Sequence, residues 1–153
     1  MFGMVPFVKA AGRGLGKMFG GKEAEDKLKK EVDDLGLKRD GVDIHVDDDG
    51  KVLVKGRGLT QEQKEKLILA VGNVDGVGEV EDGIEATDDA PAARFYTVES
   101  GDSLSKIAKE MYGDPMRYPE IFEANKPMLK DPDKIYPGQV LRIPADTKSA
   151  ANA

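Results

Sequence analysis

Residues 60–86 read TQEQKEKLILAVGNVDGVGEVEDGIEA, a stretch that predicts a helix, a glycine-rich loop and a strand in succession. Thr60 is suited to cap the start of the helix, because Gln63 follows at the spacing of a capping box. Gly72 is expected to end the helix. The apolar side of the helix consists of Leu67, Ile68, Ala70 and Val71, and the alternating apolar residues of the strand are Val77, Val80 and Ile84.

The residues before this stretch add a helix and a hairpin. In residues 22–35, KEAEDKLKKEVDDL, the apolar side chains recur at helical spacing within a charged frame. Residues 42–54 alternate apolar and polar side chains on either side of Asp48-Asp49-Gly50, a pattern typical of two strands joined by a turn. The predicted order over residues 22–86 is therefore α-β-β-α-β.

A short segment rich in Ala, Asp and Pro, residues 87–94, separates this unit from a second one. Residues 95–145 predict a strand, a helix capped by Asp102 or Ser103, a further short helix and a closing strand. The last residues, 146–153, contain almost no apolar side chains, and we expect them to be disordered. The sequence thus predicts an α+β protein of two small domains, the second with the order β-α-α-β.

The composition excludes several classes of function. A net charge of −6 and a pI near 4.9 argue against binding to nucleic acid, which requires clustered Lys and Arg. The chain has no cysteine, so disulfides, zinc–thiolate sites and thiol catalysis are excluded. No Ser, Asp or Glu is paired with a general base at the spacing of a known catalytic motif. We therefore expect a monomeric binding protein and not an enzyme.

The N-terminal segment, residues 1–21, is apolar and rich in glycine. Lys9, Arg13 and Lys17 interrupt every run that a secretory signal peptide would need. No stretch of about 20 apolar residues is present that could cross a bilayer. We expect a cytoplasmic protein whose N-terminal segment docks on the first domain. The alternative is that this cationic segment lies on a membrane surface.

Three separated motifs in the second unit carry a family resemblance. They are Phe95-Tyr96-Thr97-Val98-x-Ser100-Gly101-Asp102-Ser103-Leu104, Ile121-x-x-Ala124-Asn125 and Ile135-Tyr136-Pro137-Gly138-Gln139-x-Leu141-x-Ile143-Pro144. Together they closely resemble a LysM domain. The first unit resembles a BON domain, in which a helix leads through a Gly-Val pair, here Gly76-Val77, into a strand of alternating apolar residues.

The combination of the two domains with an FVKAAG-like N-terminus is similar to a family of small cytosolic bacterial potassium-binding proteins. This resemblance implies that K+ is the ligand. Potassium is suited to neutral backbone carbonyls, whereas calcium prefers several carboxylates. A helix end presents carbonyls without intrahelical partners, and glycines let the following chain curl around an ion. The main-chain oxygens that the resemblance implies belong to Gly72, Val74 and Val77, with Val8 and Ala11 from the N-terminal segment. We further expect ion binding to compact the BON domain against the LysM domain.

The LysM resemblance also implies an alternative function, because most LysM domains bind glycans that contain N-acetylglucosamine, such as peptidoglycan. The residues that would form the shallow glycan groove are Ser100, Gly101, Asp102, Ser103, Asn125 and Ile135. A fold does not fix its ligand, so potassium and glycan both stay open.

Other motifs have simpler interpretations. The acidic run that ends at Gly50 lies between strands and lacks the spacing of an EF-hand, which favours a hairpin turn. His45, the single histidine, alternates with Ile44 and Val46 and is expected to face solvent. The pair Ser103-x-x-Lys106 occurs without the companion motifs of penicillin-recognising enzymes, so we interpret it as a helix cap followed by an exposed lysine.

Overall fold

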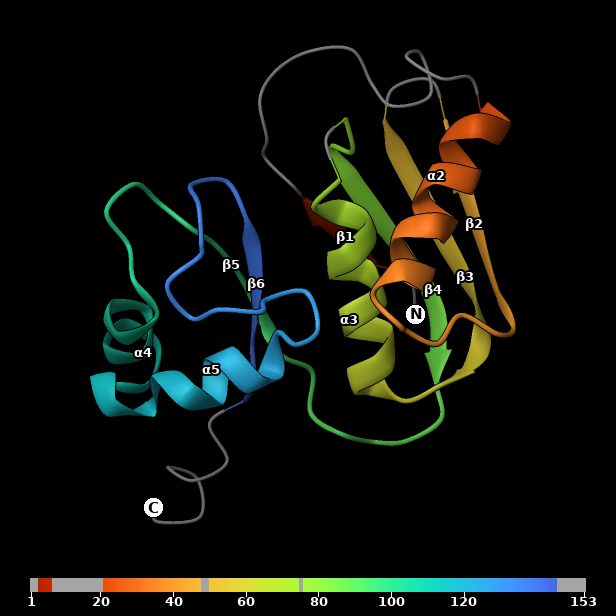
Figure 1. Cartoon of the computed structure of the whole chain (residues 1–153). Helices are drawn as coiled ribbons and strands as arrows, with labels where there is room; N and C mark the ends of the chain where they lie inside the picture. The colour runs from red at the N-terminus through yellow and green to blue at the C-terminus, as the bar shows by residue number, and fades with distance from the viewer. Residues whose placement is uncertain (1–2, 7–20, 48–49, 75, 146–153) are drawn as a thin grey trace.

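The computed structural model describes residues 3–6, 21–47, 50–74 and 76–145. It confirms an α+β fold of two small domains, which lie next to each other in Figure 1. The first domain contains β1 (Gly3–Pro6), α2 (Gly21–Asp34), β2 (Val42–Val46), β3 (Lys51–Leu59), α3 (Gln61–Gly72) and β4 (Glu79–Ala86). The second contains β5 (Arg94–Thr97), α4 (Leu104–Tyr112), the 3-10 helix η1 (Pro115–Arg117), α5 (Tyr118–Ala124) and β6 (Val140–Ile143).

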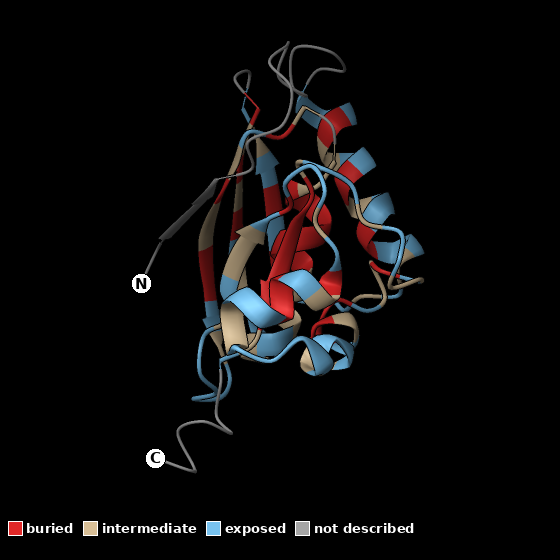
Figure 2. Cartoon of the chain, turned by 90° about the vertical axis from the view of Figure 1, so that its left-hand side faces the viewer, coloured by how far each residue is buried: buried red, intermediate tan, exposed pale blue. Residues whose placement is uncertain are grey.

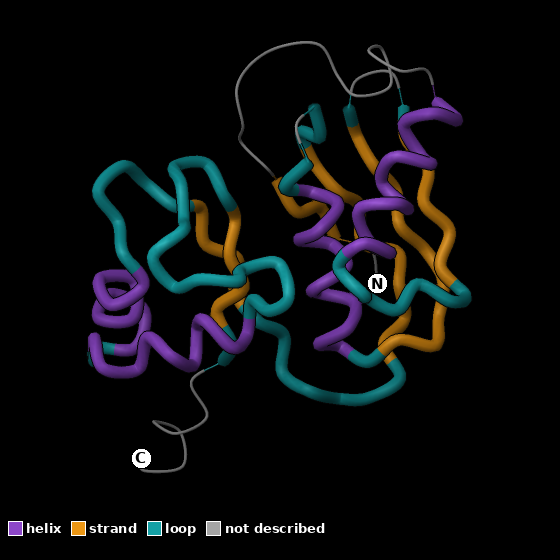
Figure 3. Tube along the Cα trace, in the orientation of Figure 1, coloured by secondary structure: helices purple, strands orange, loops and turns teal. Residues whose placement is uncertain are grey.

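The first domain is a four-stranded sheet with two helices on one face. The strand order is β1-β4-β3-β2, in which β3 and β4 are parallel and the other neighbours are antiparallel. Helices α2 and α3 lie side by side across the same face of this sheet (Figure 3). Their apolar sides meet the sheet in a core that includes Leu28, Val32, Val54, Ile68 and Val80. The predicted α-β-β-α-β order is confirmed for this domain.

The N-terminal segment contributes an edge strand that the sequence did not predict. Strand β1 pairs antiparallel with β4, and the register places Gly3 opposite Asp82 and Pro6 opposite Glu79. Glu79 is the first residue of β4. Pro6 therefore lies at the end of the sheet where the loop from α3 enters β4.

Helix α3 begins and ends where the sequence predicts. The Thr60 hydroxyl accepts the Gln63 N–H, and the Gln63 side chain accepts the Thr60 N–H, which completes the capping box. At the other end Gly72 is still helical, and Asn73 is the C-cap with a right-handed backbone conformation. The predicted end of the helix at Gly72 is therefore confirmed, although Gly72 does not itself make the left-handed turn. The left-handed turn falls at Gly76, whose φ is 94°.

The second domain packs α4 and α5 against the two-stranded sheet formed by β5 and β6. Ser103 is the N-cap of α4 and accepts the Lys106 N–H at 3.2 Å, while Gly113 closes the helix in the left-handed conformation. Figure 2 shows the buried residues in red on the inner sides of the helices and strands. The core of this domain consists of Val98, Leu104, Ile107, Ala108, Ile121, Leu129, Leu141 and Ile143.

None of the helices in the described part of the chain has the length and apolar character that a membrane span requires. His45 is exposed on β2, as its alternation with Ile44 and Val46 predicts. Strands β2 and β3 pair antiparallel, in agreement with the predicted hairpin, although residues 48–49 of its turn lie outside the described residues.

Candidate functional site

The loop between α3 and β4 contains backbone hydrogen bonds between residues three or four apart in sequence, which continue the turns of the helix. The Asn73 N–H donates to Leu69 O at 3.0 Å, and the Val74 N–H donates to Val71 O at 3.2 Å. The Val77 N–H then donates to Val74 O at 3.2 Å, across a turn that Gly76 allows. These bonds hold the carbonyls of the loop close to the carboxyl end of α3.

A further hydrogen bond ties this loop to the rest of the sheet. The Gly78 N–H donates to Gly50 O at 2.9 Å, so the loop is joined to the residue that precedes β3. Pro6 lies at the same end of the sheet, opposite Glu79. Three chain segments therefore meet around the residues that lead into β4.

The structure brings together three of the five predicted cation ligands. Gly72 and Val77 are buried, and Val74 is half-buried against the core of the first domain. The carbonyl of Val74 accepts a hydrogen bond from the Val77 N–H at 3.2 Å. The other two predicted ligands, Val8 and Ala11, lie outside the described residues.

The electrostatics of the helix end are negative. The carboxyl end of a helix carries the negative part of the helix macrodipole. The last turn of α3 contains no basic side chain that would neutralise it. In the described ranges, no group of three or more His, Cys, Asp or Glu side chains is placed to hold a metal ion.

Asn73 connects this loop directly to the second domain. Its Nδ2 donates to Val140 O at 3.0 Å, and its Oδ1 accepts the Val140 N–H at 2.9 Å. The same Nδ2 lies 3.2 Å from the sulfur of Met128. The side-chain amide thus pairs with the first residue of β6 as a neighbouring strand would.

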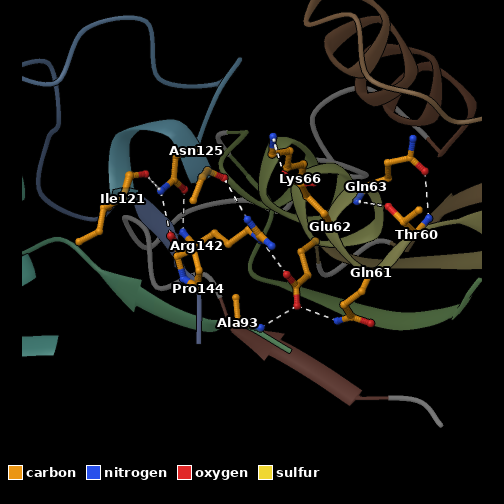
Figure 4. Close-up of polar contacts among 12 residues, drawn as sticks. Thr60, Gln61, Glu62, Gln63, Lys66, Ala93, Ile121, Asn125, Arg142 and Pro144 are labelled. Carbon is orange, nitrogen blue, oxygen red and sulfur yellow. Dashed lines mark hydrogen bonds and ion pairs between the residues drawn. The ribbon is translucent and has the colours of Figure 1, made fainter. Parts of the chain in front are cut away.

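A second polar contact joins the domains at the middle of α3. Glu65 is 2% exposed, and its Oε1 accepts Arg142 Nε at 2.6 Å. Its Oε2 accepts the Gln61 side chain at 2.6 Å and the Ala93 N–H at 2.9 Å. Figure 4 labels these three partners, Arg142, Gln61 and Ala93, which dashed lines join to the unlabelled carboxylate. The pair is therefore a buried interdomain ion pair with additional hydrogen bonds.

Beside these contacts lies an open groove of about 670 Å³ between α2, the end of α3 and the segment that precedes β6. Asn73 and Val74 line it from the first domain, and Met128 and Tyr136 line it from the second. Asn73 is half-buried and lines this groove.

Four of the predicted glycan residues lie in the turn before α4. Ser100, Gly101 and Ser103 are exposed, whereas the side chain of Asp102 is 4% exposed. Burial opposes ionisation of Asp102, but hydrogen bonds from the Glu99 N–H and the Tyr96 hydroxyl, with Lys106 nearby, outweigh it and hold the pKa of Asp102 below its ordinary value. Burial and the Asp102 carboxylate raise the pKa of Tyr96. The turn is thus fixed from inside, and its exposed surface is mainly backbone and serine.

The other two predicted glycan residues serve the fold. Asn125 is 1% exposed, and its amide donates to Ile121 O at 2.7 Å and to Arg142 O at 2.9 Å while its Oδ1 accepts the Arg142 N–H at 2.7 Å. Its side-chain amide is thus hydrogen-bonded within the second domain. Ile135 is half-buried and packs against the core of the second domain.

The sequence did not predict the interdomain contacts of Asn73, Glu65 and Arg142. Asn73 stands among the glycines and valines of the loop and carries no motif of its own. A signal for Glu65 does exist, since it lies three residues before Ile68 and four before Leu69, on the buried side of α3. Its partner is 77 residues away, so no local pattern identifies it.

Comparisons with known proteins agree with this architecture. The model of the BON domain matches residues 22–88, and the model of the LysM domain matches residues 96–144. The chain is 48% identical over 149 residues to the potassium binding protein Kbp of Escherichia coli O6:H1. The match covers 94% of this chain and 99% of that protein. It is also 57% identical over 49 residues to an uncharacterized protein of Deinococcus radiodurans. That match covers 32% of this chain and 19% of that protein. The chain, a BON domain joined to a LysM domain, therefore belongs to the family of Kbp.

Proposed function

We propose that this protein binds potassium ions through main-chain oxygens of the loop that joins α3 to β4. The observation that carries the proposal is the 48% identity, over nearly the whole of both chains, to a protein named for potassium binding. The loop supports it independently, because it gathers carbonyls at the negative end of a helix. Potassium is bound in proteins by such neutral backbone oxygens.

Gly72, Val74 and Val77 are the proposed ligands within the loop. They lie within six residues of chain, and the hydrogen bond from the Val77 N–H to Val74 O holds two of them at one turn. Gly76 permits the left-handed backbone that this turn requires. The side chains of the two valines pack inward and act only by fixing the backbone.

The N-terminal segment is proposed to supply the remaining oxygens, from Val8 and Ala11. The support is the register of β1, which brings Pro6 opposite Glu79 at the loop end of the sheet. An extended chain advances at most about 3.3–3.6 Å per residue, so Val8 lies within about 7 Å of Pro6. The segment that follows β1 is thus within reach of the loop.

We also propose that the bound ion favours the packed arrangement of the two domains over more open ones. The support is that the interdomain contact of Asn73 with Val140 is made by the C-cap of α3, next to the proposed ligands Gly72 and Val74. Binding of an ion to one of two conformations shifts their populations by its difference in affinity. We propose that this takes place in the cytoplasm, on a monomer.

The test is an amide NMR titration at constant ionic strength, in which choline chloride is replaced in turn by sodium chloride and potassium chloride. The proposal expects saturable shifts with K+ at Gly72, Val74 and Val77, and weaker or absent shifts with Na+. Small-angle scattering on the same samples should report a smaller radius of gyration with K+. Equal, unsaturated responses to both salts would contradict potassium binding.

A second candidate function is glycan binding by the LysM domain. The observation that favours it is the exposed turn of Ser100, Gly101 and Ser103 in a domain whose family model matches residues 96–144. Titration with an oligomer of N-acetylglucosamine tests it. Shifts at Gly101 and Ser103 would support glycan binding, and an unchanged spectrum at millimolar glycan would exclude it as a function of this turn.

A further inference from the structure

We propose that Asn73 is the positioning residue that couples the ion loop to the LysM domain, an inference that rests on the proposed potassium site. Its backbone belongs to the loop, and its neighbours in sequence are two proposed ligands, Gly72 and Val74. Its side chain belongs to the interface, where the amide pairs with both backbone groups of Val140. One residue thus takes part in the proposed ion site and in the contact between the domains.

The geometry of the hydrogen bonds between Asn73 and Val140 makes them sensitive to the backbone conformation of the loop. The Asn73 amide donates at 3.0 Å and accepts at 2.9 Å, and such hydrogen bonds weaken steeply when donor and acceptor lose alignment. The Gly72 carbonyl belongs to the peptide unit that contains the Asn73 nitrogen, so turning it toward an ion rotates the backbone that carries the Asn73 side chain. The orientation of the amide toward Val140 therefore depends on the orientation of the proposed ligand Gly72.

The other interdomain contact lacks this dependence. Glu65 lies eight residues before Asn73 on α3, about 12 Å along the helix axis. It sits in the interior of the helix, where every backbone carbonyl is used by the following turn. The Glu65–Arg142 pair therefore fastens the domains without reporting the state of the loop, and it provides a matched control on the same helix and the same strand.

Coupling of this kind acts in both directions. If the ion favours the Asn73–Val140 contact, the contact must favour the ion by the same factor. Couplings between sites commonly amount to about 5–150-fold in affinity. Loss of the Asn73 amide is therefore expected to weaken potassium binding by about fivefold or more, although no atom of the amide is a proposed ligand.

The experiment compares potassium titrations of the full chain and three variants by amide NMR. Asn73→Ala removes the side-chain amide and tolerates the right-handed backbone of the C-cap, at φ −80° and ψ −3°. Asn73→Asp keeps the acceptor for the Val140 N–H but loses the donor, and serves as a second variant should alanine fail to fold. Glu65→Gln weakens the other interdomain contact at nearly constant shape.

The proposal expects the loop of Asn73→Ala to bind K+ with affinity reduced about fivefold or more, while the amide of Val140 no longer responds to the ion. It expects Asn73→Asp to lie between this variant and the wild type, and Glu65→Gln to bind within twofold of the wild type. A wild type without saturable K+ binding would remove the proposed function and this inference together.

Two results would overturn the inference while leaving the function intact. The first is an affinity of Asn73→Ala within twofold of the wild type, with the Val140 response retained. The second is an equal loss of affinity in Asn73→Ala and Glu65→Gln, which would show that domain contact in general supports the site and that Asn73 has no special part in it.

Discussion

Replacing Glu65 with alanine is expected to destabilise the protein more than a surface substitution would. The carboxylate lies between the domains and receives hydrogen bonds from Arg142 at 2.6 Å, from Gln61 at 2.6 Å and from the Ala93 N–H at 2.9 Å. Glu65→Ala leaves the Arg142 side chain, which is 10% exposed, without its counter-charge. Breaking a buried ion pair from one side commonly costs about 3–5 kcal/mol.

The loss should approach that range, because the other hydrogen bond of the guanidinium to a described residue is weak. Arg142 Nη1 donates to Ala124 O at 3.4 Å, a contact that cannot replace a carboxylate. The Ala93 N–H and the Gln61 amide regain water more easily, since both lie near the surface. We therefore expect a loss of about 3–5 kcal/mol in the free energy of unfolding.

Urea unfolding followed by far-ultraviolet circular dichroism measures this change, since the chain has no tryptophan to report by fluorescence. With a urea slope of about 2 kcal/mol per molar, the midpoint should fall by roughly 2 M. The control is the double variant Glu65→Leu with Arg142→Met, which removes both charges and should recover much of the loss.

Two outcomes would refute the reasoning. A cost below about 1 kcal/mol for Glu65→Ala would mean that the pair is exposed to water in solution and behaves as a surface salt bridge. A double variant no more stable than the single one would mean that the buried guanidinium is not what makes the single substitution costly.

Three further predictions concern local structure. The folded-state pKa of Asp102 lies below its ordinary value. Its contribution to the free energy of unfolding is therefore present above about pH 4 and is lost as the pH falls through that lowered pKa. Urea midpoints of the wild type should accordingly fall more steeply in acid than those of Asp102→Asn. Thr60→Ala should cost about 1 kcal/mol by removing the capping box of α3, and Thr60→Ser, which keeps the hydroxyl, should cost much less in the same assay. Gly56→Ala should cost at least about 1–3 kcal/mol, because φ is 149° and a Cβ would collide with Gly41 O. Gly78→Ala should be nearly neutral by urea unfolding, because no atom of the described residues lies within 4 Å of the Cβ that it would add.

The elements that the sequence predicts well are those whose signals are local. The capping box of Thr60 and Gln63 spans four residues, and the hairpin of β2 and β3 is specified by alternation on both sides of a turn. Strand β1 was missed because it is only four residues long and its partner, β4, is more than 70 residues away in sequence. Short edge strands are defined by their pairing and not by their composition.

In the candidate site, too, the local features were predictable from the sequence and the long-range contacts were not. Gly72, Val74 and Val77 lie close together in the chain, and the end of α3 at Gly72 was predictable from the glycines of the following loop. The position of the left-handed turn, at Gly76, was not, because glycine permits a helical backbone as readily as a left-handed one. The contacts of Asn73 with Val140 and of Glu65 with Arg142 span 67 and 77 residues and arise only when the domains pack.

The most direct test of potassium binding is a crystal structure grown with rubidium in place of potassium, with data collected at the rubidium absorption edge. Anomalous scattering then locates the ion independently of any change in the protein. Potassium binding at the loop predicts one strong anomalous peak in contact with the main-chain oxygens of Gly72, Val74 and Val77. A fully occupied peak elsewhere in the molecule, or none at rubidium concentrations that saturate binding in solution, would contradict it.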